Sequence, residues 1–302
     1  GMRPGQPSRT AVRVALRRAA HQLLDAPLVF DDPLALQMIG KEVATAMRND
    51  PARFEVQLGA KTLRAFLAVR SRIAEDALAR SVAAGMRQYV VLGAGMDTYA
   101  YRQQVPGLRV FEVDQPATQA WKRMRLTEFG LAEPASLTFV PVDFERQSLT
   151  DELVRAGLDI AQPVFFSWLG VTPYLTNAAV FGTCEAVAAM ARAGGGITFD
   201  YAVPVESLNV FQRAAFAVLA KRVEAAGEPF VSFFDTEPLR ARLLTMGFAV
   251  VRDRGPDAIN EKYFADRADG LSVRPMGHVM TAWTREPARR SEEQTAELQS
   301  RG

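Results

Sequence analysis

The chain has 302 residues, of which 48% are hydrophobic and 23% charged, and it contains 21 glycines and 17 prolines. This composition is typical of a globular protein and excludes collagen, a coiled coil and a wholly disordered chain. The 36 lysines and arginines nearly balance the 34 aspartates and glutamates, so the formal charge of +2 gives no electrostatic footprint for nucleic acid. We therefore expect a small-molecule partner and no nucleic acid.

The scarcity of cysteine and histidine limits the chemistry that is available. Cys184 is the single cysteine, which excludes an intrachain disulfide and fits a reducing, cytoplasmic location. With His21 and His278 as the two histidines, we expect no transition-metal site built by the protein. No apolar run reaches the roughly eighteen residues that a spanning helix needs, so we expect no membrane partner.

The first 60 residues predict a helical cap. One apolar stripe recurs at helical spacing and consists of Val12, Leu16, Ala19 and Leu23. A second helix is expected over residues 34–48, after the break at Asp31-Asp32-Pro33. A longer helix is expected over residues 61–84, with Gly85 as its C-cap. Arg70 stands on the apolar stripe of this helix, where a guanidinium reaches the helix edge or points into a pocket that holds an anion.

Short apolar runs alternate with helical stretches from residue 88 onward. The expected strands cover residues 88–92, 109–114, 137–142, 163–168, 196–201, 248–251 and 279–283. The expected helices cover residues 117–129, 148–156, 177–192, 207–226 and 237–246. This alternation predicts an α/β fold with a doubly wound, mostly parallel sheet. The expected domains are a cap over residues 1–60, a Rossmann-like domain over residues 61–285 and a polar, disordered tail over residues 286–302.

The sharpest motif follows the first expected strand, in Leu92-Gly-Ala-Gly-Met-Asp-Thr98. Gly93 and Gly95 predict a turn at which the backbone approaches a ligand closely, at the strand end where open α/β sheets bind ligands. A dinucleotide fingerprint needs a third glycine where Thr98 stands, which disfavours NAD and FAD. The turn suits a ligand without a pyrophosphate, such as S-adenosylmethionine, with a plain tight turn as the alternative. Asp97 starts the next helix or accepts from the ammonium group of the ligand.

Further polar and aromatic residues follow the next strands. Asp114 ends the second strand, where a carboxylate accepts from both hydroxyls of a ribose. Asp143 is expected to meet the adenine amino group, with Phe144 near the ring, and a helix start is the alternative. Glu112 lies deeper on the same face as Asp114, as a buried structural acid or a functional one. Trp168 is expected to wall the pocket, with core packing as the alternative.

These segments together resemble the leucine carboxyl methyltransferase-like family of S-adenosylmethionine-dependent methyltransferases, in its bacterial O-methyltransferase branch. The segments that carry the resemblance are Pro27–Pro33, Leu92–Thr98, Phe111–Pro116, Val142–Phe144 and Tyr263–Gly270. The resemblance implies a class I methyltransferase fold with C-terminal insertions. It also implies that the glycine turn lies against the methionine part of the cofactor, that Asp114 holds the ribose, and that Asp143 and Phe144 hold the adenine.

Two further positions follow from the resemblance. Arg70 matches an arginine that contacts the cofactor carboxylate, and Arg72 is the fallback. Leu169 stands where many members have a glutamate, five residues before Tyr174, so a contact near the cofactor amino group is missing or supplied by backbone.

The expected reaction is the transfer of a methyl group from S-adenosylmethionine to a carboxyl or hydroxyl oxygen of a small molecule. A carboxylate needs no base, whereas a phenol or an alcohol is helped by one. No catalytic residue is assigned; His21 is a candidate base with a packed histidine as the alternative, and Tyr174 and Tyr201 are further candidates. The alternatives for the whole chain are an NAD(P)-dependent oxidoreductase and a cofactor-binding homologue without turnover. The oligomeric state is left open.

Overall fold

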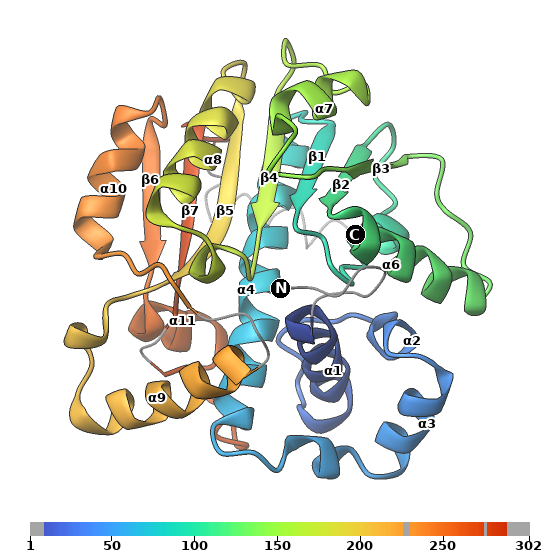
Figure 1. Cartoon of the computed structure of the whole chain (residues 1–302), viewed down its shortest axis with the longest axis vertical. Helices are drawn as coiled ribbons and strands as arrows, with labels where there is room; N and C mark the ends of the chain where they lie inside the picture. The colour runs from blue at the N-terminus through green and yellow to red at the C-terminus, as the bar shows by residue number, and fades with distance from the viewer. Residues whose placement is uncertain (1–8, 226–229, 275–276, 289–302) are drawn as a thin grey trace, which may run out of the picture.

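A seven-stranded sheet forms the centre of the computed structural model, which describes residues 9–225, 230–274 and 277–288 (Figure 1). The strands are β1 (Gln88–Leu92), β2 (Arg109–Asp114), β3 (Leu137–Pro141), β4 (Val164–Trp168), β5 (Gly195–Ala202), β6 (Val250–Arg254) and β7 (Gly277–Arg285). Their order is β3-β2-β1-β4-β5-β7-β6. The first five strands pair in parallel, and β7 runs antiparallel to both of its neighbours. The topological switch point, where ligands bind in such sheets, therefore lies between β1 and β4.

Helices cover both faces of the sheet. They are α1 (Arg9–Leu24), α2 (Ala35–Met38), α3 (Lys41–Asn49), α4 (Ala60–Ala83), α5 (Tyr99–Arg102), α6 (Pro116–Glu128), α7 (Leu149–Arg155), α8 (Asn177–Met190), α9 (Val210–Ala225), α10 (Thr236–Thr245) and α11 (Pro256–Tyr263). Three short 3-10 helices are η1 (Pro51–Glu55), η2 (Thr172–Tyr174) and η3 (Val205–Ser207). The apolar side chains of α7, α8 and α10 join one core cluster, and those of α4 and α5 join another on the opposite face. Figure 1 shows α1, α2, α3 and α9 beyond the carboxyl ends of the parallel strands, around the switch point.

The predicted fold class is confirmed, and the parallel strands lie within one residue of their predicted bounds. Buried parallel strands are short apolar runs, so their sequence signal is strong. The helix predicted over residues 34–48 is wrong as a single element, because Gly40 with a φ of 89° separates α2 from α3. The predicted stripe of α1 is also wrong in part, since Val12 and Leu23 are exposed.

The C-terminal part holds one element that the sequence pattern did not indicate, helix α11 between β6 and β7. The two strands pair antiparallel, and β7 lies inside the sheet while β6 forms its edge. Most of the predicted polar tail, from residue 289 onward, lies outside the described residues. The division into a cap and a sheet domain stays a prediction. None of the described helices has the length and apolar character that crossing a membrane requires.

Candidate functional site

The glycine turn after β1 joins the carboxyl ends of β1 and β2. The N–H of Gly93 donates to the carbonyl of Val113 at 2.8 Å. The N–H of Gly95 donates to Oδ2 of Asp114, also at 2.8 Å. Gly93 has a φ of 64°, and a Cβ at this position would lie 2.7 Å from a side-chain carbon of the loop after β4. A glycine is therefore required where these loops approach each other.

Asp114 lies at the tip of β2, and two backbone N–H groups hold its carboxylate in place. Its Oδ1 accepts from the N–H of Gln115 at 2.8 Å, while its Oδ2 accepts from Gly95. Burial raises the pKa of Asp114, and these two backbone hydrogen bonds offset part of the rise. The carbonyl of Asp114 accepts from the N–H of Val142 at 3.0 Å, which brings Asp143 to the adjacent strand tip. Each carboxylate oxygen keeps acceptor capacity for a ligand hydroxyl.

The other predicted residues of the nucleoside side differ in exposure. The side chain of Asp143 is 46% exposed, and it accepts from the N–H of Glu145 at 3.1 Å. Phe144 is 52% exposed, so its ring is available for contact with a base. Trp168 is 3% exposed and packs in the main core, with its ring 6.1 Å from that of Phe199. The contacts of Trp168 are those of core packing, and a contact with a cofactor stays a prediction.

Arg70 reaches from α4 to the carboxyl ends of β4 and β5. Its Nη1 donates to Oδ2 of Asp200 at 3.1 Å, and Oδ1 of Asp200 accepts from the N–H of Gly170 at 2.7 Å. Gly170 has a φ of 72°, and a Cβ there would lie 2.9 Å from Nη2 of Arg70. Arg70 is 8% exposed and is paired with Asp200, so it does not reach solvent at the helix edge; its contact with a ligand anion stays a prediction. Arg72, the fallback, is exposed and pairs with Asp76 at 3.1 Å.

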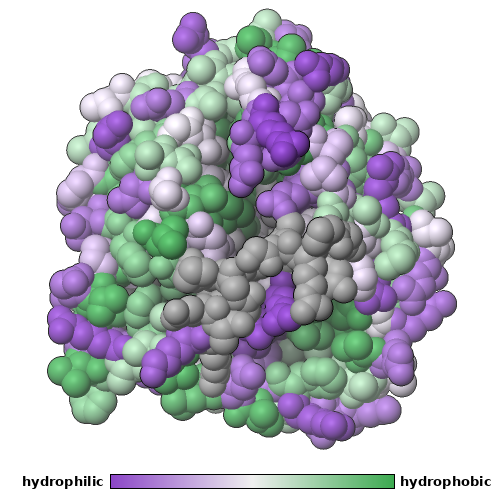
Figure 2. All heavy atoms as spheres, viewed as in Figure 1, coloured by the Kyte–Doolittle hydropathy of each residue, from purple (hydrophilic) through white to green (hydrophobic). Residues whose placement is uncertain are grey.

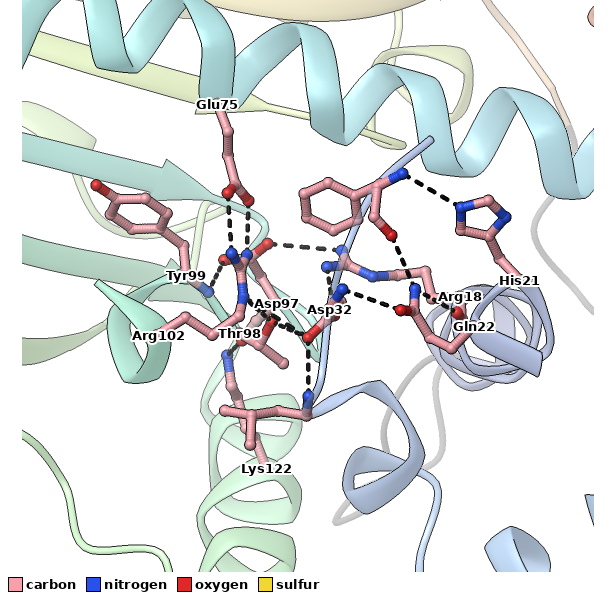
Figure 3. Close-up of polar contacts among 12 residues, drawn as sticks. Arg18, His21, Gln22, Asp32, Glu75, Asp97, Thr98, Tyr99, Arg102 and Lys122 are labelled. Atoms are coloured by element: carbon pink, nitrogen blue, oxygen red, sulfur yellow. Dashed lines mark hydrogen bonds and ion pairs between the residues drawn. The ribbon is translucent and has the colours of Figure 1, made fainter. Parts of the chain in front are cut away.

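A buried charged network lies beside the glycine turn (Figure 3). Nη1 of Arg18 lies 3.5 Å from Oδ1 of Asp97, and its Nη2 donates to Oδ2 of Asp32 at 3.1 Å. The hydroxyl of Thr98 donates to Oδ1 of Asp32 at 2.8 Å and accepts from Nε of Arg102 at 2.8 Å. Burial by itself raises the pKa of Asp97, but the nearby cations, with Arg18 first, bring it below its usual value. The network thus joins α1 and the loop before α2 to the turn.

Two more contacts complete this network. Glu75 of α4 accepts two hydrogen bonds from Arg102, at 3.0 and 2.7 Å. Oδ2 of Asp97 accepts from the N–H of Tyr99 at 3.1 Å, an i to i+2 contact of the turn before α5, whose N-cap is Thr98 and has no side-chain cap. The predicted contact between Asp97 and a cofactor ammonium group stays a prediction. The sequence did not indicate Arg18 or the other members from distant segments, because tertiary packing alone makes them partners.

His21 is not placed to act as a base, and the packed-histidine alternative is correct. The residue is 1% exposed, and its Nδ1 lies 2.7 Å from Oδ2 of Asp25. Its Nε2 accepts from the N–H groups of Val29 and Phe30, each at 3.2 Å. Both ring nitrogens are therefore occupied by structural contacts.

Glu112 is a buried acid beneath the site. Its Oε1 accepts from Nζ of Lys122 at 2.6 Å, and both side chains are 1% exposed. Nζ of Lys122 also donates to the carbonyl of Asp97 at 2.5 Å. These contacts are those of a buried structural acid, which was one of the two alternatives for Glu112. Through Lys122, the Glu112–Lys122 pair holds the carbonyl of Asp97, next to the glycine turn.

The pH dependence of stability is expected to report on Glu112. Burial raises the pKa of Glu112 to about 7, although Lys122 acts in the opposite direction. Because this acid binds its proton more tightly in the folded chain, its contribution to stability falls as the pH rises from about 4.5 to about 7. Urea unfolding at several pH values across this window is expected to show a less negative slope in Glu112→Gln than in the wild type. Equal slopes would contradict the assignment.

The space-filling view shows the molecule from the same side as Figure 1 (Figure 2). A hollow lies at the tip of β4, with hydrophobic residues on the side of α8 and hydrophilic residues toward β2 and β3. Within the described part of the chain, no group of three or more His, Cys, Asp or Glu side chains is placed to hold a metal ion. The arrangement suits a ligand with a polar nucleoside end and offers an apolar wall beside its other end.

The amino-acid sequence is similar to a known protein family and to individual bacterial proteins. The model of the leucine carboxyl methyltransferase family matches residues 11–188, which is more than half of the chain. YktD of Bacillus subtilis, named as a candidate S-adenosyl-L-methionine-dependent methyltransferase, is 32% identical over 93% of this chain and 99% of its own length. A protein of Frankia alni with the same kind of name is 36% identical, over 61% of this chain and 65% of its own length.

Solved structures give a likeness of fold. A candidate methyltransferase from Thermobifida fusca superposes with a TM-score of 0.53 at 18% sequence identity, covering 94% of this chain and 97% of that one. At this identity the likeness concerns the architecture of the sheet and its helices.

Proposed function

The chain belongs to the leucine carboxyl methyltransferase family, and on this premise we propose that it is an S-adenosyl-L-methionine-dependent O-methyltransferase acting on a small molecule. The acceptor atom in this proposal is a carboxyl or hydroxyl oxygen. The observation that carries the proposal is the contact between Asp114 and the N–H of Gly95 at 2.8 Å, at the switch point of the sheet. Membership of a methyltransferase family argues against the alternative of an NAD(P)-dependent oxidoreductase.

The residues at the strand tips fit an adenosyl sulfonium with an amino-acid end. Asp114 offers acceptor atoms to ribose hydroxyls, while Asp143 and Phe144 stand at the neighbouring tip for the adenine. The guanidinium of Arg70, oriented by Asp200, is the cation for the carboxylate end. These roles are part of the proposal, as are those of the glycine turn, Asp97 and Trp168.

The chain contributes alignment rather than covalent chemistry. When bound, S-adenosylmethionine supplies a methyl group on a positively charged sulfur, and the acceptor oxygen displaces that sulfur in line. An ion pair of Arg70 with the carboxylate end and hydrogen bonds of Asp114 with the ribose would hold the cofactor on both sides of its sulfur, which sets the direction of the methyl group. Helices α1 and α9 lie beyond the strand ends, where they would limit the access of water to a bound cofactor. An oriented pair of reactants needs no protein nucleophile.

Binding of S-adenosylhomocysteine tests the proposal. At a concentration of about 100 times its Kd, a ligand that binds the folded state alone adds about 2.7 kcal/mol of stability. Thermal unfolding with S-adenosylhomocysteine is therefore expected to show a Tm higher by several degrees, with NAD as a control that leaves the Tm unchanged. The same Tm with S-adenosylhomocysteine at about a millimolar would count against the proposal.

A second assay separates an enzyme from a homologue that binds the cofactor without turnover. The chain is incubated with methyl-labelled S-adenosylmethionine and a small-molecule extract of bacterial cells. Labelled product is expected in the extract, whereas binding without labelled product favours the homologue without turnover. The cytoplasmic location, expected from the single cysteine, stays a prediction.

A further inference from the structure

A hydrogen-bonded histidine lies at the same edge of the sheet, away from the glycine turn. His278 is near the start of β7 and pairs in register with Tyr201 of β5. Its Nδ1 lies 2.8 Å from Oδ2 of Asp253, which belongs to β6. The hydroxyl of Tyr201 donates to Oδ1 of Asp253 at 2.6 Å and lies 2.8 Å from Oγ1 of Thr236. Both oxygens of this carboxylate are therefore engaged, and the imidazole is held in one orientation.

These contacts determine where the neutral ring carries its proton. A carboxylate accepts hydrogen bonds, so Nδ1 of His278 donates and Nε2 presents its lone pair. Nε2 makes no hydrogen bond or ion pair with any described residue, and the side chain is 18% exposed. The chain has two histidines, and His21 has both nitrogens occupied. His278 is thus the histidine with a nitrogen available to a ligand.

Tyr201 and Gly255 lie against the His278–Asp253 pair. Burial raises the pKa of Tyr201, and its hydrogen bond to Asp253 raises it further, so the phenol stays a neutral donor. Glu237 of α10 is a second negative charge near Tyr201. Gly255 faces the ring, and a Cβ there would lie 3.0 Å from its Cε1.

The imidazole ring of His278 lies at the edge of the sheet that holds the proposed site. In the β5–β7 pair, Tyr201 and His278 stand one register beyond Asp200 and Val279. Asp200 binds Arg70 at the strand tips. His278 therefore lies at the carboxyl edge, on the β5–β7 side of the sheet, while Asp114 lies on β2. Because neighbouring residues of a strand point to opposite faces, Tyr201 and His278 lie on the face of α10, and Asp200 lies with Arg70 on the face of α4.

We propose that His278 is the general base that takes the proton of an acceptor hydroxyl, and that Asp253 positions it. This inference rests on the proposed function and narrows the acceptor to a phenol or an alcohol. The O–H bond of the acceptor breaks and its proton goes to Nε2. The new O–CH₃ bond forms as the C–S bond of the methyl donor breaks, and the electron pair of that bond stays on sulfur. The imidazolium beside Asp253 then releases the proton to water.

The test begins with the chemistry of the product. The wild type is incubated with methyl-labelled S-adenosylmethionine and a small-molecule extract of bacterial cells, and the labelled product is treated with base. A methyl ether from a hydroxyl acceptor keeps its label, whereas a methyl ester releases labelled methanol. We expect base-stable label; base-labile label would overturn the role of His278 and leave the proposed function intact.

Variants then separate the base from the binding site. His278→Asn is expected to lower the rate of label transfer by about 10²- to 10⁴-fold while the Kd of S-adenosylhomocysteine stays within about twofold. Asp253→Asn is expected to lower the rate and change its pH profile, whereas Asp257→Asn, an exposed acid on α11, is the matched control with the wild-type rate. A wild-type rate in His278→Asn overturns the inference, and absence of S-adenosylhomocysteine binding in the wild type overturns the proposed function instead.

A measurement on the wild type covers the case in which the variants do not fold. Nitrogen-15 NMR of histidine-labelled protein gives one pair of ring signals for each of the two histidines. At a pH at which the ring is neutral, His278 is expected to carry its proton on Nδ1. A proton on Nε2 would overturn the inference, because that nitrogen then has no lone pair for the acceptor proton.

Discussion

Replacing Asp32 by alanine is expected to lower the free energy of unfolding by about 3–5 kcal/mol, the range for removing one partner of a buried ion pair. The side chain of Asp32 is fully buried, and it accepts from Arg18, Thr98 and the N–H of Leu34. Its loss leaves a partly buried guanidinium and a buried hydroxyl without their acceptor. Urea unfolding followed by circular dichroism measures the effect.

The neighbouring acid offers a matched control for this experiment. Asp31 is exposed, so Asp31→Ala is expected to change the free energy of unfolding by less than about 0.5 kcal/mol. Similar losses in both variants would contradict the network shown in Figure 3. A loss confined to Asp32→Ala would identify this loop as an anchor of the N-terminal helices on the glycine turn.

Replacing Asp114 by alanine is expected to weaken the binding of S-adenosylhomocysteine by roughly 1–3 kcal/mol, because the ribose hydroxyls lose a charged acceptor. At about 1.4 kcal/mol per tenfold change, the Kd rises by roughly 5- to 150-fold. The N–H of Gly95 loses its partner as well, so part of the effect comes from a less ordered turn. Isothermal titration calorimetry of the folded variant measures the Kd.

The control for this measurement is Glu261→Ala, which removes an exposed acid of α11. This variant is expected to bind S-adenosylhomocysteine with the wild-type Kd. An unchanged Kd in folded Asp114→Ala would mean that the ribose lies elsewhere.

The fold could be predicted where burial imposes a simple pattern. Strands β1 and β2 have their predicted bounds, because parallel strands covered on both faces are continuous apolar runs. Helix α11 has no comparable signal, since its sequence is mixed and its packing depends on α4 and β6. Gly40 interrupts a helical pattern that is otherwise regular, and its positive φ is a property of the folded loop.

The comparisons confirm the family, the methyltransferase class and the cofactor that the sequence predicts. The sheet topology and the solved structure from Thermobifida fusca confirm the fold class. The acceptor group, the domain division and the roles of the site residues stay predictions. The segments that carry the family resemblance, such as Leu92–Thr98, are contiguous in the chain, so they can be recognised without knowing the tertiary contacts.

The partners of the local motifs could not be predicted in the same way. Asp114 is the last residue of β2, whereas β5 continues to Ala202, so no strand-end signal in the sequence marked Asp200. Its partner Arg70 is 130 residues away, so the pairing depends on how α4 crosses the sheet. His278 likewise meets Asp253 because β6 and β7 pair, and the spacing of 25 residues carries no signal.

A crystal structure of the complex with S-adenosylhomocysteine would show where the cofactor binds. Both ribose hydroxyls are expected within about 3.2 Å of the carboxylate of Asp114. The adenine is expected beside Asp143 and Phe144, and the carboxylate end is expected to face Arg70. A ligand bound away from the tips of β1 and β2, or a ribose without contact to Asp114, would refute the proposed cofactor site.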